Sequence, residues 1–315
     1  MNNKSLLKAL AVASLVAVAA IMPLFLTTRY VYVLASTLPY TIVGVCFFFL
    51  LQAGLANFAL ISFMGLGAYS SSLSMMKLGL SFWPALLLGG LISLVVALIT
   101  GSAVLRCKGP YFLLVTIAFT ELFKELVVQF SNLTGGFNGL TGIPHPTYLK
   151  SDAARYLLIV FMVFVSLLII YRLNVGWLGK VLRGMGPTED LEKSVGINTN
   201  KYKLIAFAIV SFFAGISGAL SAQAVGYVSP ESIGMMQMFY LILYVVVGGE
   251  TFFAGPIVGI IAMRIVQSLI THGSVYEPVI FGGLMVVILR WSPKGLLGAI
   301  SALYLKLSKS KAVQT

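Results

Sequence analysis

The sequence predicts an all-α polytopic integral membrane protein with about ten transmembrane spans. Hydrophobic residues make up 59% of the 315-residue chain and charged residues only 10%, whereas a soluble domain carries about a quarter charged residues. The apolar runs are long enough to cross a bilayer, which takes about 20 helical residues. Residues 205–224 are apolar on every face instead of at alternate positions, so the pattern does not fit a membrane β-barrel.

Ten hydrophobic runs define the predicted spans, and the whole chain, 1–315, is predicted to be one transmembrane domain. The spans cover residues 6–27, 31–52, 56–76, 82–105, 111–130, 156–173, 203–226, 236–253, 256–272 and 276–292. Gly and Pro interrupt the third, eighth and ninth runs, which we therefore expect to be broken or re-entrant. Residues 1–22 also have the charged start and apolar run of a signal peptide, but the run continues to Leu26, which favours a retained first helix.

The lysines and arginines orient these spans. With a cytoplasmic N-terminus, 15 of the 21 positive residues fall inside the cell and 4 outside, while Lys124 and Arg264 lie within spans. Both termini and the loop 174–202 are then cytoplasmic, and the loop 131–155 is extracytoplasmic. The net charge of +12 is therefore mainly an orientation signal, to which anionic membrane lipid adds attraction. It does not indicate nucleic-acid binding.

Two further patterns concern how the spans are arranged. Five spans per half would make the second half enter the membrane upside down, as in inverted-repeat transporters, although no tandem sequence repeat is visible. Small residues also recur four apart, at Ser211, Gly215 and Ala219 and again at Ala214, Gly218 and Ala222. Helix packing explains both of these ridges.

The cytoplasmic loop 174–202 contains a predicted short helix at about 187–195. Gly186 can cap its start, Pro187 suits the first helical position, and Gly196 is a stop signal. The acidic residues gather near its start, where the helix dipole favours negative charge. The pattern fits either an ordinary capped surface helix or a rigid docking element for a cytoplasmic partner.

Charged and irregular positions within the spans are candidates for a translocation path. Glu121 and Lys124 lie three apart on one helix face, so they form either a self-neutralising pair or part of the path. Arg264 has no acidic neighbour in sequence, and we expect Glu250 or Glu121 to pair with it. Irregular backbone at membrane depth is tolerated only against protein or a watery cavity. The candidate path residues are Gly54, Asn57, Glu121, Lys124, Gly248, Gly249, Glu250 and Arg264.

Several motifs resemble those of ABC-importer permeases for branched-chain amino acids, of the LivM type. The outer-loop sequence LTGGFNGLTGIP, residues 133–144, is similar to the family pattern LTGGxNGLTGIP. Residues 196–198 and 201–207 are similar to the end of the family's cytoplasmic loop. Further matching stretches are Tyr111–Glu121, Val228–Ser232 and Pro293–Leu296.

Residues 184–187 of the cytoplasmic loop depart from the family pattern, as do Leu191, Glu192 and two further stretches. In GLANFALISFMGLGAY, which begins at Gly54, Asn57, Ala59 and Leu60 replace Ser, Gly and His. In GGETFFAGP, which begins at Gly248, Thr251 replaces Gly and Glu250 is an unexpected acid. Both lie where a substrate path would run.

The resemblance implies a permease subunit of an ABC importer in the bacterial inner membrane, which translocates Leu, Ile and Val. It implies a second, related permease subunit in a hetero-dimer, two cytoplasmic ATPase subunits and an extracytoplasmic substrate-binding protein. The ATPase would grip Pro187, Thr188, Glu189, Asp190, Leu191, Glu192, Val195, Gly196 and Ile197. The binding protein would face Thr134, Gly135, Gly136, Asn138 and Gly139, in a loop that otherwise reads as a flexible linker.

Other functions remain as alternatives. Relatives in the same family carry urea, purine nucleosides, amides or aromatic acids. A stand-alone secondary transporter or channel would need a chain of titratable groups, for which Glu121, Lys124 and Arg264 give thin support. The chain has no GxxxxGK[ST] phosphate loop, so it is predicted not to be an enzyme, and ATP would be used by partner subunits. Two cysteines without metal-ligand spacing predict no metal site, and no cofactor is expected on this chain.

Overall fold

The computed structural model describes residues 28–107, 109–145, 151–194 and 198–269, and the isolated helical positions 279, 282–283, 290 and 295–298. For residues 28–30, 186–194 and 269 it describes the backbone only. The helices are α2 (Thr28–Leu51), α3 (Leu60–Leu78), α4 (Phe82–Val104), α5 (Pro110–Gln129), α6 (Ser131–Thr134), α7 (Asp152–Val175), α8 (Trp177–Ser194), α9 (Thr199–Val225), α10 (Met235–Gly248) and α11 (Gly255–Leu269). Two 3-10 turns, η2 (Gly136–Asn138) and η3 (Pro230–Ile233), and two short strands, β1 (Leu140–Thr141) and β2 (Tyr227–Val228), complete the described elements.

The described helices form the bundle that an all-α polytopic membrane protein requires. Four of them are long and apolar enough to span a membrane, namely Val31–Leu51, Phe82–Val104, Asp152–Val175 and Thr199–Val225. The helical runs predicted between residues 31 and 272 are confirmed as helices, with boundaries that shift by a few residues. The predicted span 6–27 lies outside the described residues, and the predicted span 276–292 lies almost entirely outside them.

Helix α9 is the centre of the bundle and packs against α2, α3 and α4. Its ridge of small residues allows close crossing, because a Cβ on Gly67 of α3 would stand 2.1 Å from the carbonyl oxygen of Gly215. A Cβ on Gly218 would stand 1.7 Å from the carbonyl oxygen of Met64. The hydroxyl of Ser93 on α4 joins the same crossing and donates to the carbonyl of Phe63 at 3.0 Å. The sequence-based interpretation of these small residues as packing positions is confirmed.

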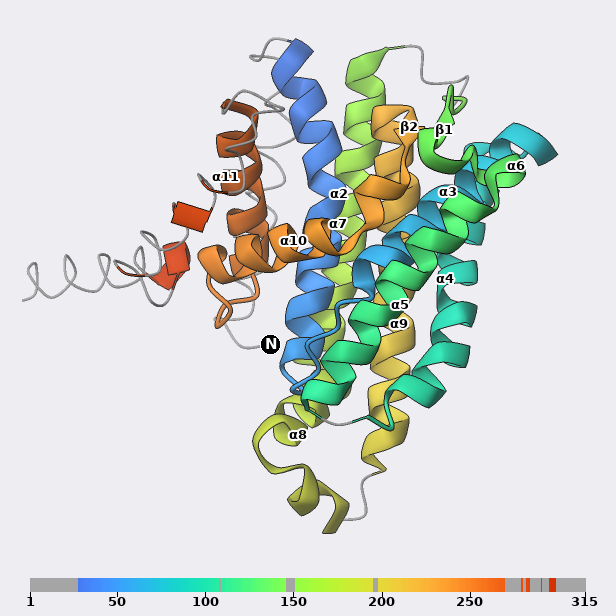
Figure 1. Cartoon of the computed structure of the whole chain (residues 1–315). Coiled ribbons are helices and arrows are strands. Elements are labelled where there is room, and N and C mark those ends of the chain that lie inside the picture. Colours follow the sequence, from blue (N-terminus) through green and yellow to red (C-terminus); the bar gives the residue numbers. More distant parts are fainter. Residues whose placement is uncertain are drawn as a thin grey trace, which may run out of the picture.

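The two ends of the bundle differ in structure (Figure 1). At one end, β1 pairs antiparallel with β2, with Leu140 opposite Val228 and Thr141 opposite Tyr227. At the other end lies α8. The described parts of loops 131–155 and 174–202 therefore lie at opposite ends of the bundle, as their predicted placement on opposite sides of a membrane requires.

The predicted start of the helix in the loop 174–202 is wrong. The residues expected to form a helix at 187–195 are helical as far as Ser194, but the helix begins at Trp177 and not at Pro187. The buried side chains of Val181, Leu182 and Met185 attach its first half to the bundle. Because this half packs against protein, the backbone continues through Gly186 and Pro187 without a new helix start.

Candidate translocation site

The first break in the helices, between α2 and α3, contains Gly54 and Asn57. Gly54 is exposed and has a φ of +72°, a conformation that glycine adopts most easily. Asn57 is fully buried, and its side-chain oxygen accepts from the backbone N–H of Ala59 at 3.0 Å. Its amide nitrogen has no hydrogen-bond partner among the described residues.

Two threonines of α5 hold this break in place, and neither is among the predicted site residues. The hydroxyl of Thr116 accepts from the backbone N–H of Phe58 at 3.3 Å, and the hydroxyl of Thr120 donates to the carbonyl of Phe58 at 3.1 Å. Polar backbone inside a membrane needs such partners. The threonines sit four apart on one face of α5, which is the pattern that could have revealed them.

The second break, between α10 and α11, contains Gly248 and Gly249. A Cβ on Gly248 would stand 1.9 Å from the carbonyl oxygen of Gly255, and one on Gly259 would stand 2.0 Å from that of Tyr244. The two helices thus form a hairpin of close backbone contact. Helix α10 has 14 residues and a length of ~21 Å, which is shorter than the ~30 Å hydrocarbon core. The predicted broken or re-entrant character of this region agrees with that length.

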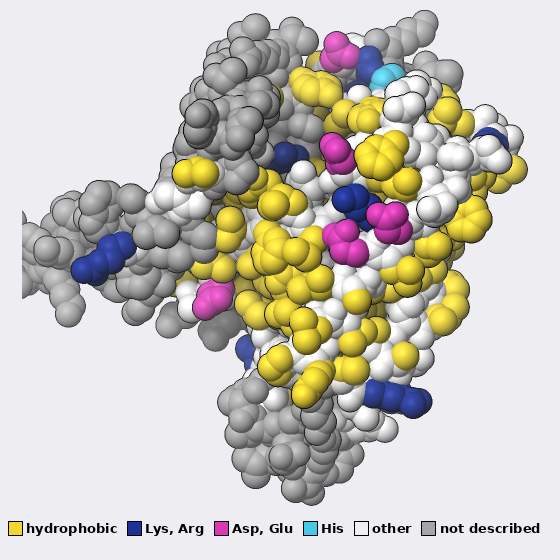
Figure 2. Space-filling model, in the orientation of Figure 1, with side chains coloured by type: hydrophobic (Ala, Val, Ile, Leu, Met, Phe, Trp, Pro, Cys, Tyr) yellow, Lys and Arg dark blue, Asp and Glu magenta, His cyan; other side chains and the backbone are white. Residues whose placement is uncertain are grey.

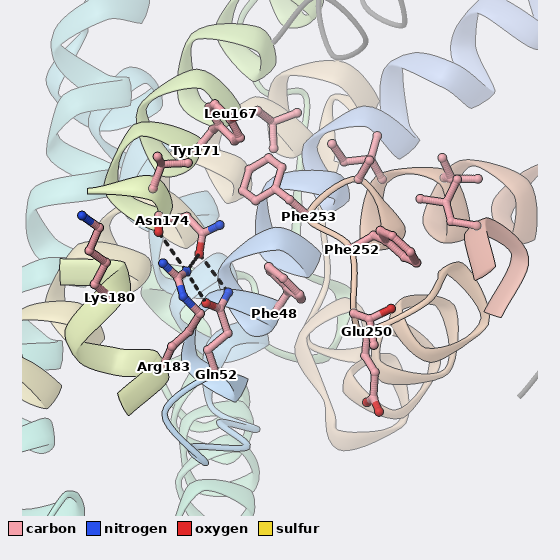
Figure 3. Close-up of a pocket in the computed structure, with 16 residues that line it drawn as sticks. Phe48, Gln52, Leu167, Tyr171, Asn174, Lys180, Arg183, Glu250, Phe252 and Phe253 are labelled. Atoms are coloured by element: carbon pink, nitrogen blue, oxygen red, sulfur yellow. Dashed lines mark hydrogen bonds between the residues drawn. The ribbon is translucent and has the colours of Figure 1, made fainter. Parts of the chain in front are cut away.

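A cavity of about 740 Å³ lies between the second break, α8 and the ends of α2 and α7 (Figure 3). The aromatic side chains of Phe48, Tyr171, Phe252 and Phe253 form much of its wall. The ring of Phe253 contacts Phe48 and Tyr171 edge-on, with centroids 6.2 and 5.2 Å apart. Of the predicted path residues, Glu250 lines this cavity, whereas Gly54, Asn57, Glu121, Lys124 and Arg264 do not.

A polar network lines the cavity on the α8 side, and none of its residues is among the predicted site residues. The guanidinium of Arg183 donates from Nη1 to Gln52 Oε1 at 3.0 Å and to the backbone carbonyl of Asn174, also at 3.0 Å. Gln52 donates from Nε2 to Asn174 Oδ1 at 2.9 Å. Figure 3 shows the Arg183 guanidinium between the other two side chains. One cation of α8 therefore connects the ends of α2 and α7.

The predicted ion pair of Arg264 with Glu250 or Glu121 is wrong. The Arg264 guanidinium lies over the ring of Tyr40, 4.4 Å from the centroid, and donates to Gln267 Oε1 at 3.4 Å. Among the described residues it makes no ion pair with Glu250 or Glu121. A cation–π contact with Tyr40 takes the place of the expected carboxylate.

Glu121 and Lys124 lie apart from the cavity, on the face where α5 meets the start of α10. Glu121 Oε1 accepts from the backbone N–H of Met235, the first residue of α10, at 3.0 Å. The side chain of Lys124 lies along Gly234, with Cδ and Nζ 3.5 and 3.6 Å from where a Cβ on that glycine would stand. No ion pair joins Glu121 and Lys124 in the described part of the chain. The interpretation of Glu121 and Lys124 as a self-neutralising pair is therefore wrong, because Glu121 binds the backbone of α10 instead.

Comparison with known proteins identifies the family. The model of the family described as "Branched-chain amino acid transport system / permease component" matches residues 29–289. The chain belongs to this permease family. It is 30% identical to the high-affinity branched-chain amino acid transport system permease protein LivM of Salmonella typhimurium over 312 residues, which cover 90% of this chain and 73% of that protein.

Two further relatives belong to the same transport systems. The LivM protein of Escherichia coli K12 is 31% identical over 262 residues, which cover 75% of this permease and 62% of the relative. The LivH permease protein of E. coli K12 is 24% identical over 168 residues, which cover 51% and 54% of the two chains. No solved structure matches this permease.

Residues 131–145, the described part of the loop 131–155, are folded, so the alternative interpretation of this part as a flexible linker is wrong. The hydroxyl of Thr134, a buried residue, donates to the carbonyls of Val127 and Phe130 at 2.5 and 2.9 Å. Gly135, Gly136 and Gly139 all have positive φ. Asn138 is exposed. The glycines give the loop its shape, because other residues rarely adopt positive φ.

One glycine of this loop provides a test of that shape. A Cβ on Gly139 would stand 2.1 Å from the carbonyl oxygen of Val228, beside the β1–β2 pair. We expect Gly139→Ala to separate the two strands, which limited proteolysis between residues 131 and 144 would detect as faster cleavage. Gly142→Ala has the same positive φ but open space around the new Cβ, so it serves as the control. Equal cleavage of the two variants would contradict the expectation.

Burial lowers the pKa of His145, which follows this loop, and the positive charge of Arg155 lowers it further. The imidazole is therefore neutral at pH 7.

The residues predicted to contact the ATPase lie at the opposite end of the permease. Helix α8 contains the backbone of six of them, Pro187, Thr188, Glu189, Asp190, Leu191 and Glu192, while Val195, Gly196 and Ile197 lie outside the described residues.

Proposed function

We propose that this chain is the membrane-spanning permease subunit of an ABC importer that moves Leu, Ile and Val into the bacterial cell. A binding protein would deliver the amino acid, and ATP hydrolysis in separate subunits would drive its passage. The family match and the relatives' names support this proposal. The geometric observation that carries it is that α8 and the α10–α11 break share the walls of one cavity.

The proposal includes a membrane topology. The chain would cross the inner membrane ten times, with both termini and α8 in the cytoplasm and β1–β2 outside. Two halves of five spans would form an inverted repeat. The position of α8 and β1–β2 at opposite ends of the bundle supports this arrangement.

The proposal also includes partners. A second, related permease would complete the membrane domain, two ATPase subunits would bind the cytoplasmic loop, and this chain would bind no nucleotide itself. The contacts of α8 suggest how force would reach the cavity. A movement of α8 would act through Arg183 on Gln52 and Asn174, at the ends of α2 and α7. Because both helix ends also line the cavity, their displacement would change its opening.

Uptake by the complete transporter tests this function. We expect proteoliposomes that contain both permeases and both ATPases to accumulate radiolabelled leucine when the loaded binding protein and ATP are present. Unlabelled isoleucine and valine should compete, whereas urea, adenosine and benzoate should not. Replacing ATP with a non-hydrolysable analogue provides the control. Uptake by this chain without the ATPases would instead support a stand-alone transporter. Stronger competition by urea or adenosine than by isoleucine and valine would indicate that the transporter carries that compound instead.

A further inference from the structure

Four charged side chains gather where α5 meets η3 and the start of α10, and they form what we call the α5 charge cluster. They are Glu121, Lys124 and Glu125 of α5 and Glu231 of η3. The turn η3 packs against α5, which brings Glu231 to the same region. Figure 2 shows acidic and basic side chains gathered near the middle of a face that is otherwise largely hydrophobic, and Figure 1 shows α5 and α10 at this position in the same orientation.

The cluster would lie within the membrane, because α5 covers the predicted span 111–130. Glu121 is eight residues before the end of α5 at Gln129, which corresponds to ~12 Å along the helix axis. The Lys124 ammonium does not extend to the helix end, because its Nζ lies beside Gly234, next to the residue whose N–H binds Glu121. Ionisable groups at such depth are rare and usually line a water-filled path or a site.

The charged groups of the cluster form no ion pairs with one another within the described part of the chain. No ion pair connects Lys124 with any of the three carboxylates there. Glu125 and Glu231 are exposed, and Glu121 and Lys124 are half-buried. Glu121 and Glu125 also lie four apart, a spacing at which like charges on a helix repel. The cluster therefore offers one cation for an anion and has carboxylates available for a cation.

Apolar side chains border the cluster on α10 and α5. Met236, in the first turn of α10, is 59% exposed, and Phe239 one turn later is 37% exposed. Leu122 of α5 is exposed as well. A ligand with both charges and a branched hydrocarbon side chain would match the cluster and this border together.

We propose that the α5 charge cluster binds the zwitterionic backbone of the transported amino acid at a point on its path. The Lys124 ammonium would hold the α-carboxylate, Glu125 and Glu231 would hold the α-ammonium, and Met236 would contact the side chain. Glu121 acts as a positioning residue, since its carboxylate is bound to the backbone of α10. This inference rests on the proposed function and adds the residues that recognise the substrate within the membrane.

Cysteine protection in the complete transporter tests the binding site directly. The two native cysteines, Cys46 and Cys107, would be replaced with serine, and Met236→Cys would introduce one exposed target for a maleimide. We expect 10 mM leucine to slow labelling at least threefold. Leucinamide, which lacks the carboxylate, and 4-methylpentanoate, which lacks the ammonium, should have no effect. Protection by either of these probes that equals protection by leucine would overturn the zwitterion site.

Charge removal provides the second measurement. In the cysteine-labelling background, Lys124→Met should abolish protection by leucine, and in uptake it should lower the maximal rate at least tenfold. The external leucine concentration for half-maximal uptake should stay unchanged, because the binding protein determines it. Arg106→Met, which removes an exposed positive charge at the far end of α4, should leave protection and uptake unchanged.

The outcomes separate this inference from the proposed function. If the parent transporter takes up leucine and Lys124→Met does so equally well, the site is wrong and the function stands. If the parent takes up no leucine, the proposed function itself fails. Loss of the second permease from the purified Lys124→Met complex would show that the cluster holds the two subunits together, and that result would also overturn the amino-acid site.

Discussion

Replacing Gly218 with alanine is expected to destabilise this permease more than any other single methyl group added to the described helices. The new Cβ would stand 1.7 Å from the carbonyl oxygen of Met64 and 2.9 Å from the backbone nitrogen of Ala68. Both neighbours are helix backbone, so a change of side-chain rotamer cannot relieve the overlap. Overpacking costs about 1–3 kcal/mol where the surroundings can adjust, and we expect more than about 3 kcal/mol here.

Thermal unfolding in detergent measures this effect. We expect Gly218→Ala to lower the midpoint by roughly 5 °C or more and to reduce the monodisperse peak in size-exclusion chromatography. Gly234→Ala is the matched control for stability, because its new Cβ would lie 3.5 Å from the flexible Lys124 side chain. An unchanged midpoint for Gly218→Ala would mean that α3 and α9 do not cross as closely as the structure describes.

Replacing Arg183 with alanine is expected to uncouple ATP hydrolysis from uptake. The change removes the group that joins α8 to Gln52 and Asn174. A hydrogen bond to a charged group contributes about 1.5–3 kcal/mol, and about 1.4 kcal/mol corresponds to a factor of ten. We therefore expect leucine transported per ATP hydrolysed to fall about tenfold or more, while the ATPase rate stays within about twofold.

Two further variants make the Arg183 experiment specific. Arg183→Lys should retain part of the coupling, because an ammonium carries charge but lacks the planar fork that reaches several acceptors. Arg172→Ala removes an exposed cation near the end of α7. It should change neither the leucine transported per ATP hydrolysed nor the ATPase rate. If Arg183→Ala lowers uptake and ATPase activity in proportion, the residue supports assembly and does not transmit force.

The positions of the helices could be predicted from the sequence where the length of an apolar run and its Gly or Pro boundaries decide them. The run 82–105 became α4, Phe82–Val104, and the run 111–130 became α5, Pro110–Gln129. The interruption predicted at 248–256 separates α10 from α11. The start of α3 was predicted four residues too early, at 56, because threonines of α5 hold the backbone of Phe58 in the break.

The candidate site was less predictable, since its contacts join residues far apart in the chain. Arg183 was counted only as an orientation signal, and its partner Gln52 lies 131 residues away in sequence. Spacing in the sequence suggests Lys124 as one possible partner of Glu121, but a backbone N–H of α10 binds its carboxylate. Arg264 was expected to find an acid, but Tyr40 offers an aromatic face. Which partner a charged side chain binds depends on which helices pack together, and the spacing of residues along the sequence does not show this.

The pairing of β1 with β2 connects the loop that follows α5 to the start of α10. Leu140 is bound to the strand that continues through Ser229 into η3 and then α10. A molecule that presses on the exposed ring of Phe137 would thereby shift the start of α10, which lies ~12 Å along the axis of α5 from its end. A contact made at η2 would thus reach the start of α10 through covalent connections and strand pairing within one chain.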